Sequence, residues 1–227
     1  MNEWIPRTEL GKLVYEGKIK HIDEILDRGI RIKEPEIVDK LIPNLEVQLL
    51  NIGQAKGKFG GGRRKPFRVT QRKTEDGNKP KFSVMAVVGN RNGYIGLGFG
   101  ASSETMPARE KAIREAKLNL IKIRRGCGSW QCGCGTPHSI PFKIRGRSGS
   151  VRVEFIPAPK GVGLAVHDEC KILFELAGVK DVWGRSFGQT RTRINLLYAT
   201  FNALKQLKET KVPESFKKFA GVVEGEV

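Results

Sequence analysis

The sequence predicts an α+β protein made of two units, preceded by a helical N-terminal extension. Short runs typical of strands surround long amphipathic segments, of which 108–125 and 190–207 are the longest. Neither half shows the regular strand–helix alternation of a doubly wound enzyme. The 227 residues are enough to bury a substantial core without a disulfide framework.

The N-terminal extension, assigned to residues 1–55, contains three short apolar stripes. Pro35 stands where the first turn of a helix tolerates proline, just before the third stripe. Helices this short are not stable alone, so we expect them to pack on the body of the protein or on a partner. The stripes recur at helical spacing and consist of Leu10, Leu13, Val14, Ile22, Ile25, Leu26, Ile37, Val38 and Leu41.

The first α+β unit, assigned to 56–125, combines three strands with one basic helix. Strands are predicted at 67–73, 81–89 and 94–100, joined by the turn sequences EDGN and NRNG. Gly96, Gly98 and Gly100 leave the backbone of the third strand approachable. The helix is predicted over 108–125, because Ala112, Ala116, Leu120 and Ile123 recur at helical spacing.

The second α+β unit, assigned to 140–210, begins after a cysteine-rich loop at 126–139. A hairpin is predicted between 139–144 and 150–157, followed by a helix at 167–178 that ends at Gly178. A short strand at 179–185 and a long helix at 190–207 complete it. Residues 211–227 are expected to form a C-terminal tail.

The net charge indicates which classes of molecule the protein binds. The chain has 41 Lys and Arg residues against 24 Asp and Glu, a formal net charge of +17, which indicates nucleic acid, an anionic membrane or an acidic protein. The N-terminus lacks a signal-peptide core, and no apolar run approaches the roughly 18 residues that span a bilayer. We therefore expect a soluble intracellular protein without a membrane partner.

A basic segment from 56 to 73 contains no acid. Its three consecutive glycines and the repulsion between like charges favour a mobile segment that a polyanion neutralises, although a solvated linker is the alternative. The residues predicted to contact phosphates are Lys56, Lys58, Arg63, Arg64, Lys65, Arg68, Arg72 and Lys73.

Four further residues are candidates for RNA contact, each with a purely structural alternative. Arg91 and Asn92 lie at the tip of the NRNG turn and could reach a phosphate or a 2′-hydroxyl, but such residues also simply form turns. Arg124 and Arg125 end the predicted helix, where cations favour the helix dipole in any protein.

The loop RRGCGSWQCGCGTPHSIPF contains a candidate zinc site. Cys127, Cys132, Cys134 and His138 follow the spacing C-x4-C-x-C-x3-H, and four sulfur and nitrogen donors on one compact loop are typical of a closed tetrahedral zinc site. The zinc ion is expected to clasp the two units, because a glycine-rich joint without metal would let them drift, and Trp130 and Pro137 are expected to shield the thiolates. A loop without metal and a disulfide remain alternatives.

The remaining cysteine and the other two histidines have no further metal-ligating residue at a suitable spacing in the sequence. Cys170 lies on a predicted helix beside apolar residues, where a buried thiol is the usual case. His21 and His167 are interpreted as structural or surface residues.

Four stretches together resemble the universal small-subunit ribosomal protein five family. They are KFSVMAVVGNRNGYIGLGFGASSETMPAREKAIREAKLNLI, PFKIRGRSGSVRVEFIPAPKGVGLAV, FELAGVKDVWGRSFG and NLLYATFNALKQL, and they keep order, spacing and glycine placement from about 67 to 207. The segment WIPRTELGKLVYEGKI is similar to the extension of the archaeal and eukaryotic branch.

The resemblance implies a fold and a set of partners. It implies a first domain like a double-stranded RNA-binding domain and a second with a left-handed βαβ unit. It also implies a non-catalytic constituent of the cytoplasmic small ribosomal subunit that binds ribosomal RNA and contributes to decoding fidelity. The implied neighbours are ribosomal proteins four and eight, and messenger RNA where it enters its channel. No self-association is expected. The family does not supply the zinc site, which depends on the cysteine spacing alone.

An enzyme is the alternative from a different class. PAPKGVGLAV, residues 157–166, places its glycines much as the phosphate loop of certain small-molecule kinases does. The likeness stops at Leu164, Ala165 and Val166, where such kinases have a Ser-Ser-Ala run, and the chain has no Walker motif.

Overall fold

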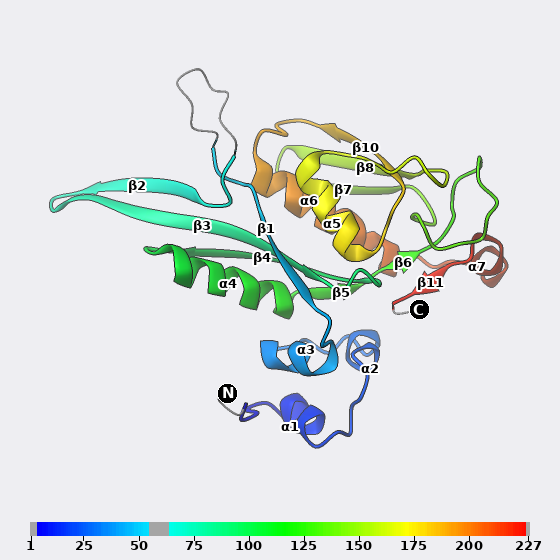
Figure 1. The fold of residues 1–227 in the computed structure, drawn as a ribbon, viewed down its shortest axis with the longest axis horizontal. Coiled ribbons are helices and arrows are strands. Elements are labelled where there is room, and N and C mark those ends of the chain that lie inside the picture. Colours follow the sequence, from blue (N-terminus) through cyan, green and yellow to red (C-terminus); the bar gives the residue numbers. More distant parts are fainter. Residues whose placement is uncertain (1–3, 55–63, 226–227) are drawn as a thin grey trace.

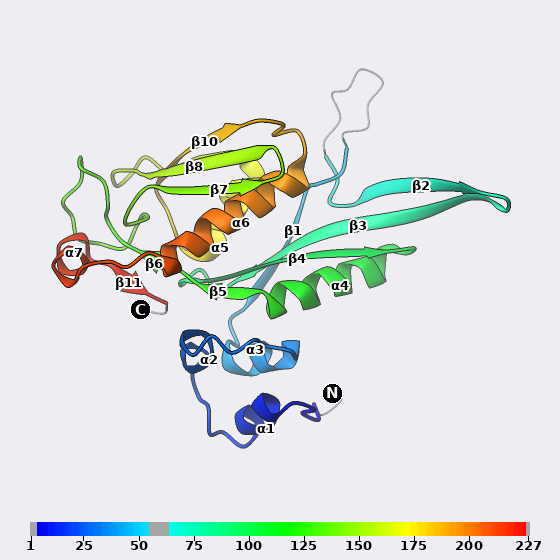
Figure 2. The ribbon, with the colours of Figure 1, turned by 180° about the vertical axis from the view of Figure 1, so that it is seen from behind.

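The computed structural model describes residues 4–54 and 64–225, arranged as alternating helical and sheet layers (Figures 1 and 2). Helix α4 covers the outer face of one sheet, helices α5 and α6 fill the space between the two sheets, and the second sheet closes the stack. The α+β class predicted from the sequence is confirmed. No helix within the described ranges is long and apolar enough to cross a membrane.

Three short helices form the N-terminal extension, as predicted. Glu34 accepts hydrogen bonds from the backbone N–H groups of Arg7 and Thr8, at 2.9 and 2.6 Å, and so holds the first helix against the third. Lys122 of the first unit pairs with Asp23 at 3.1 Å and so ties the extension to the sheet. The helices are α1 (Glu9–Tyr15), α2 (Asp23–Asp27) and α3 (Pro35–Leu41).

The first unit has a five-stranded antiparallel sheet rather than the three strands expected. The long strand β3 (Gly77–Gly89) pairs with β2 (Arg68–Thr74) along its outer half and with β1 (Glu46–Leu50) along its inner half. Strand β4 (Tyr94–Ser102) lies on its other side, followed by β5 (Leu120–Lys122). Strand β1 falls inside the segment for which only helices were predicted.

Helix α4 (Thr105–Leu118) lies directly on the glycines of β4. A Cβ atom added to Gly96, Gly98 or Gly100 would come within 2.2 Å of the α4 backbone. The prediction that these glycines leave the strand open to a close approach is therefore confirmed, and the approaching element is α4.

The prediction of one helix over 108–125 is wrong at its C-terminal end. The helix stops at Leu118, and Arg124–Arg125 form the short strand β6. That strand pairs with β11 (Val223–Glu224), which follows helix α7 (Glu214–Ala220) in the segment expected to be a tail. Arg124 and Arg125 therefore do not sit at a helix C-terminus.

The second unit has a four-stranded sheet in the order β7-β8-β10-β9. Helix α5 connects the parallel neighbours β9 and β10, and it ends at Gly178 with φ of 79°, as predicted. The elements are β7 (Ile144–Ser148), β8 (Val151–Pro157), β9 (Leu164–Ala165), α5 (Asp168–Ala177), β10 (Val182–Phe187) and α6 (Arg193–Glu209).

One continuous hydrophobic core joins the two units. Met85 and Ile95 of the first sheet belong to the same buried cluster as Phe155 of the second sheet and Phe174 of α5. The turn between β3 and β4 adds polar contacts, because the N–H groups of Arg91 and Gly93 donate to the carbonyls of Leu176 and Ala177 at 2.9 and 3.2 Å. The turn thus satisfies carbonyls that the end of α5 would otherwise leave free.

Candidate metal centre and RNA interface

The cysteine-rich loop is closed at its base and supported from the C-terminus. Gly126 and Ser139 form an isolated antiparallel bridge, with N···O distances of 2.9 and 3.2 Å. The N–H of Cys127 donates to the carbonyl of Ala220 in α7 at 2.8 Å. The loop is therefore held by both ends and by α7.

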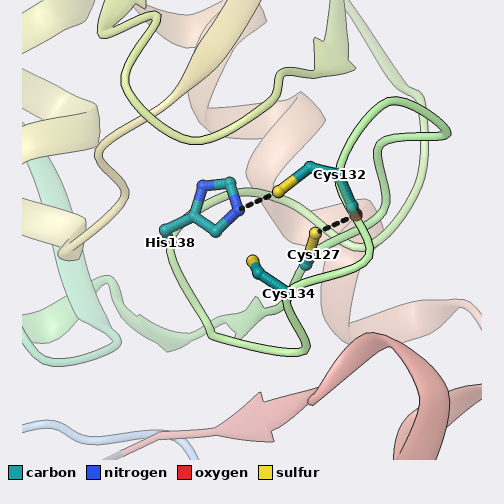
Figure 3. Close-up of side chains that lie close together, drawn as sticks. All are labelled: Cys127, Cys132, Cys134 and His138. Atoms are coloured by element: carbon teal, nitrogen blue, oxygen red, sulfur yellow. Dashed lines mark hydrogen bonds between the residues drawn. The ribbon is translucent and has the colours of Figure 1, made fainter.

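The four predicted ligands converge inside this loop (Figure 3). The Sγ atoms of Cys127, Cys132 and Cys134 and a ring nitrogen of His138 all lie within 4.8 Å of one another. A tetrahedral zinc ion with Zn–S bonds of about 2.3 Å places its donors about 3.8 Å apart. The four donors are thus close to the geometry of one metal ion and need a contraction of less than about 1 Å.

The orientation of His138 suits metal binding. Its Nδ1 lies 2.8 Å from Oδ2 of Asp181, and its Nε2 faces Sγ of Cys132 at 3.9 Å. Both side chains of the His138–Asp181 pair are only 6% exposed. A carboxylate that accepts the Nδ1 proton leaves the lone pair of Nε2 directed at the thiols, which is the arrangement found around histidine ligands of zinc.

The three thiols lie in different environments. Burial raises the pKa of Cys127, which donates to the carbonyl of Cys132 at 2.7 Å. The hydroxyl of Thr136, 3.1 Å from Sγ, lowers the pKa of the exposed Cys134 to about 6. Metal binding requires thiolates, so it must displace the proton that burial favours on Cys127.

Trp130 and Cys170 do not belong to the cluster of four donors. Trp130 is 88% exposed, so the expectation that it shields the thiolates is wrong. Cys170 is buried 3.3 Å from the hydroxyl of Thr200, and burial raises its pKa to about 11. It stays apart from the metal ligands, as expected.

The glycine-rich loop at 157–166 has no free phosphate cradle. The N–H groups of Gly161 and Gly163 donate to Oδ1 of Asp181 at 3.1 and 2.8 Å. The backbone amides that a phosphate loop would direct at its ligand are thus already bonded to a carboxylate of the same chain.

A cationic hairpin forms the candidate RNA interface. Strands β2 and β3 extend from the sheet as a ribbon that no helix covers at its tip (Figures 1 and 2). Their register places Arg72 opposite Lys79 and Thr70 opposite Lys81. Side chains of directly opposed residues lie on one face, so Arg68, Arg72, Lys79 and Lys81 form one cationic row. We call this row the hairpin face.

The predicted RNA-contacting residues separate into two groups. Lys56, Lys58 and Arg63 lie outside the described residues, whereas Arg64 and Lys65 lead into β2, which contains Arg68, Arg72 and Lys73. Arg91, Asn92, Arg124 and Arg125 lie at the other end of the molecule, in the β3–β4 turn and β6. The structure thus places Arg68, Arg72 and Lys73 on the hairpin and leaves the second group apart from it.

The second group has partners within the chain. Arg91 pairs with Glu46 at 2.9 Å, and Arg124 pairs with Glu224 at 2.6 Å. Oδ1 of Asn92 accepts from Arg125 at 2.6 Å. Their contact with RNA stays a prediction.

Two groups of residues in these candidate sites were not predicted from the sequence. Lys79 and Lys81 of the hairpin face follow the acidic EDGN turn, and only the strand register places them beside Arg72. Asp181 supports His138 from 43 residues away in the chain. The two-residue alternation of β3 was a usable signal for the lysines, whereas no local pattern marks Asp181.

Comparisons with known proteins place the chain in one family. A family model described as Ribosomal protein S5, N-terminal domain, matches residues 66–124, and one described as Ribosomal protein S5, C-terminal domain, matches 146–217. The small ribosomal subunit protein uS5 of Nanoarchaeum equitans is 54% identical over 227 residues, which is 100% of this chain and 97% of that protein.

Two further relatives have the same name. The protein of Methanocaldococcus jannaschii is 48% identical over 227 residues, covering 100% of this chain and 98% of the relative. The protein of Pyrobaculum islandicum is 51% identical over 209 residues, covering 92% and 96%. This family is structural and not enzymatic, so the kinase alternative is wrong. The chain belongs to the ribosomal protein S5 family, in its archaeal branch.

Proposed function

We propose that the chain is a structural constituent of the cytoplasmic small ribosomal subunit and binds ribosomal RNA. Full-length identity to archaeal proteins named for that subunit supports the assignment. The observation that carries the RNA contact is the hairpin face, in which Arg72 lies directly opposite Lys79. Lys79 pairs with Asp76 at 3.1 Å, but Arg68, Arg72 and Lys81 have no carboxylate partner among the described residues. A polyanion that binds across both strands would neutralise the repulsion between these like charges.

The family resemblance supports more detailed proposals about the fold, the position in the subunit and the neighbours. The first domain resembles a double-stranded RNA-binding domain, and the β9–α5–β10 crossover of the second is proposed to be left-handed. The chain is proposed to lie where messenger RNA enters its channel, beside ribosomal proteins four and eight, and to contribute to decoding fidelity as a single copy. Phosphate and shape contacts suit this task, because side chains cannot read bases in the narrow major groove of A-form RNA.

Salt-dependent binding to an RNA duplex tests the RNA contact. If about six cations neutralise phosphates, log K falls against log salt with a slope of roughly −5. Replacing Arg72 and Lys81 with alanine should make the slope shallower by about two. A variant with Lys20→Ala and Lys33→Ala, two exposed lysines of the N-terminal extension, is the matched control and should keep the parental slope. If the variant without Arg72 and Lys81 had the same salt slope as the parent, the proposal would be contradicted.

We also propose that Cys127, Cys132, Cys134 and His138 hold one structural zinc ion. The convergence of the donors and the support of His138 by Asp181 favour this reading over a loop without metal. Bound zinc would add electrostatic stabilisation for the thiolates and fix the loop against α7. The donor set leaves no position for a substrate.

Elemental analysis of protein purified without added metal tests the zinc site. The expected result is about one zinc per chain in the parent, since the site supplies four protein ligands. Cys132→Ser should remove the metal while far-ultraviolet circular dichroism stays parental, because neither sheet contains a ligand. Cys170→Ser changes a thiol outside the site and is the control that should retain zinc. A parent without zinc, with its loop thiols titratable in the native state, would contradict the proposal.

A further inference from the structure

A groove of about 1060 Å³ lies between the two units, beside the Cys/His loop. Residues from five separate segments line it, so the groove exists only in the assembled fold. Its lining includes the loop residues 136–138 and the glycine-rich loop at Gly161 and Gly163. The side chains that give it its charge are Arg91, Arg125, Lys160, Lys171, Lys180, Glu175 and Asp181.

Cations dominate the lining even after internal pairing is considered. Both carboxylate oxygens of Asp181 are occupied by Gly161, Gly163 and His138. Arg91 pairs with Glu46, and Lys171 pairs with Asp168 at 2.9 Å. Within the part of the chain that the structure describes, Arg125, Lys160 and Lys180 have no carboxylate partner.

Arg125 is a buried cation in the lining of this groove. It is 5% exposed, and burial lowers its pKa. Its Nη2 donates to Oδ1 of Asn92 and to the carbonyl of Gly225 at 2.6 and 3.0 Å, both neutral acceptors. Its Nε has no acceptor among the described residues. A buried guanidinium normally has a counter-charge, since its desolvation is otherwise uncompensated.

The lining indicates which anion supplies the counter-charge. Guanidinium groups bind phosphate strongly because their fork of donors matches its oxygens. The lining contains no Phe, Tyr or Trp side chain on which a base could stack, and the ring of its one histidine, His138, is held by Asp181. The glycine amides that would cradle the phosphate of a free nucleotide are bonded to Asp181. These features suit the phosphates of a nucleic-acid backbone better than a nucleotide.

We propose that this interdomain groove is a second RNA contact, in which a backbone phosphate binds beside Arg125, Lys160 and Lys180. The proposal rests on the RNA-binding function proposed above and adds a site to it. The groove is lined by Arg125 of β6, and β6 lies far from the tip of the β2–β3 hairpin (Figures 1 and 2). The protein would therefore connect two separate RNA segments.

The test measures binding of the full chain to a labelled RNA duplex of about 30 base pairs over a range of salt concentrations. The groove variant has Lys160→Ala and Lys180→Ala, two exposed side chains whose removal leaves the core intact. We expect a slope shallower by about two and, at about 0.1 M salt, binding weaker by at least about tenfold. Lys20→Ala with Lys33→Ala makes the same change of charge elsewhere and should bind as the parent does.

The outcomes separate the groove from the general function. If the parent binds RNA and the groove variant matches the control, the groove inference is overturned and the hairpin contact stands. If the parent itself fails to bind RNA, both fail. Calorimetry with inorganic phosphate identifies the source of the anion: saturable phosphate binding that the groove variant loses, with RNA binding unchanged, would assign the groove to a small phosphorylated ligand and overturn the RNA assignment.

Discussion

Asp181 connects three segments of the chain through hydrogen bonds. Its Oδ2 faces His138, its Oδ1 accepts from Gly161 and Gly163, and its carbonyl accepts from the hydroxyl of Ser139. The buried carboxylate of Asp181 therefore orients the ring of a candidate metal ligand and accepts from the glycine-rich loop, and its backbone carbonyl anchors the base of the Cys/His loop.

Replacing Asp181 with asparagine should weaken zinc binding by about tenfold to a hundredfold. The amide keeps one oxygen for the glycines but presents an NH₂ group to Nδ1 of His138, which then cannot donate its proton. A competition titration against a chromophoric chelator measures the affinity. Asp168→Asn is the control, because Asp168 is 87% exposed and lies outside this network. Equal zinc affinity in D181N and the parent would mean that Asp181 does not position the ligand.

At the residue scale, the four candidate zinc ligands were predictable from the sequence, whereas the contact of Asp181 with His138 was not. Cys127, Cys132, Cys134 and His138 lie on one short loop, so glycine-rich spacing alone brings them together. Asp181 approaches only because β10 lies beside the loop in the tertiary fold. Arg125 was assigned to a helix end, whereas its burial depends on pairing between β6 and β11, which are about 100 residues apart.

At the element scale, the closest packing in the first unit is between α4 and β4. Alternate glycines of β4 face the alanines of α4, and the opposite face of the strand presents Ile95 and Leu97 to the shared core. The helix can lie this close because neither element has a side chain larger than a methyl group at the contact.

Gly98→Ala should therefore destabilise the protein by at least about 2 kcal/mol. The added Cβ would lie 2.2 Å from the carbonyl of Ala112 and from the backbone nitrogen of Ala116, so the helix must move away. Denaturation in urea, followed by circular dichroism, measures the free energy of unfolding. Gly133→Ala is the control, because nothing lies within 4 Å of its Cβ position. A G98A protein as stable as G133A would show that α4 shifts at no cost.

Elements that follow a local period were predictable, and those defined by distant pairing were not. The helices α5 and α6 and the strands β3 and β4 were expected near their observed positions. The end of α4 was misassigned because Leu120 and Ile123 continue the helical spacing, although after Asn119 they are buried in and beside β5. Strands β1 and β11 are short and pair with segments far away in the chain, so no local signal marks them.

At the scale of the whole molecule, the two α+β units share one hydrophobic core. Leu50 and Val87 of the first sheet share a buried cluster with Leu173 of α5 and Leu204 of α6. A glycine-rich joint was expected to let the units drift unless zinc held them together. The shared core and the capping of α5 by the β3–β4 turn make that rigidity independent of metal.

We therefore expect a single unfolding transition both with and without zinc. Removal of the metal by a chelator should lower the melting temperature, since a ligand that binds only the native state stabilises it by mass action. It should not split the transition, because the core that spans both sheets contains none of the four ligands. Trp4 in the N-terminal extension and Trp183 in β10 provide local probes: in two single-tryptophan variants, their fluorescence should change at the same temperature as the circular dichroism signal. Trp183 fluorescence that melts separately from the circular dichroism signal after chelation would mean that zinc, and not the shared core, couples the two units.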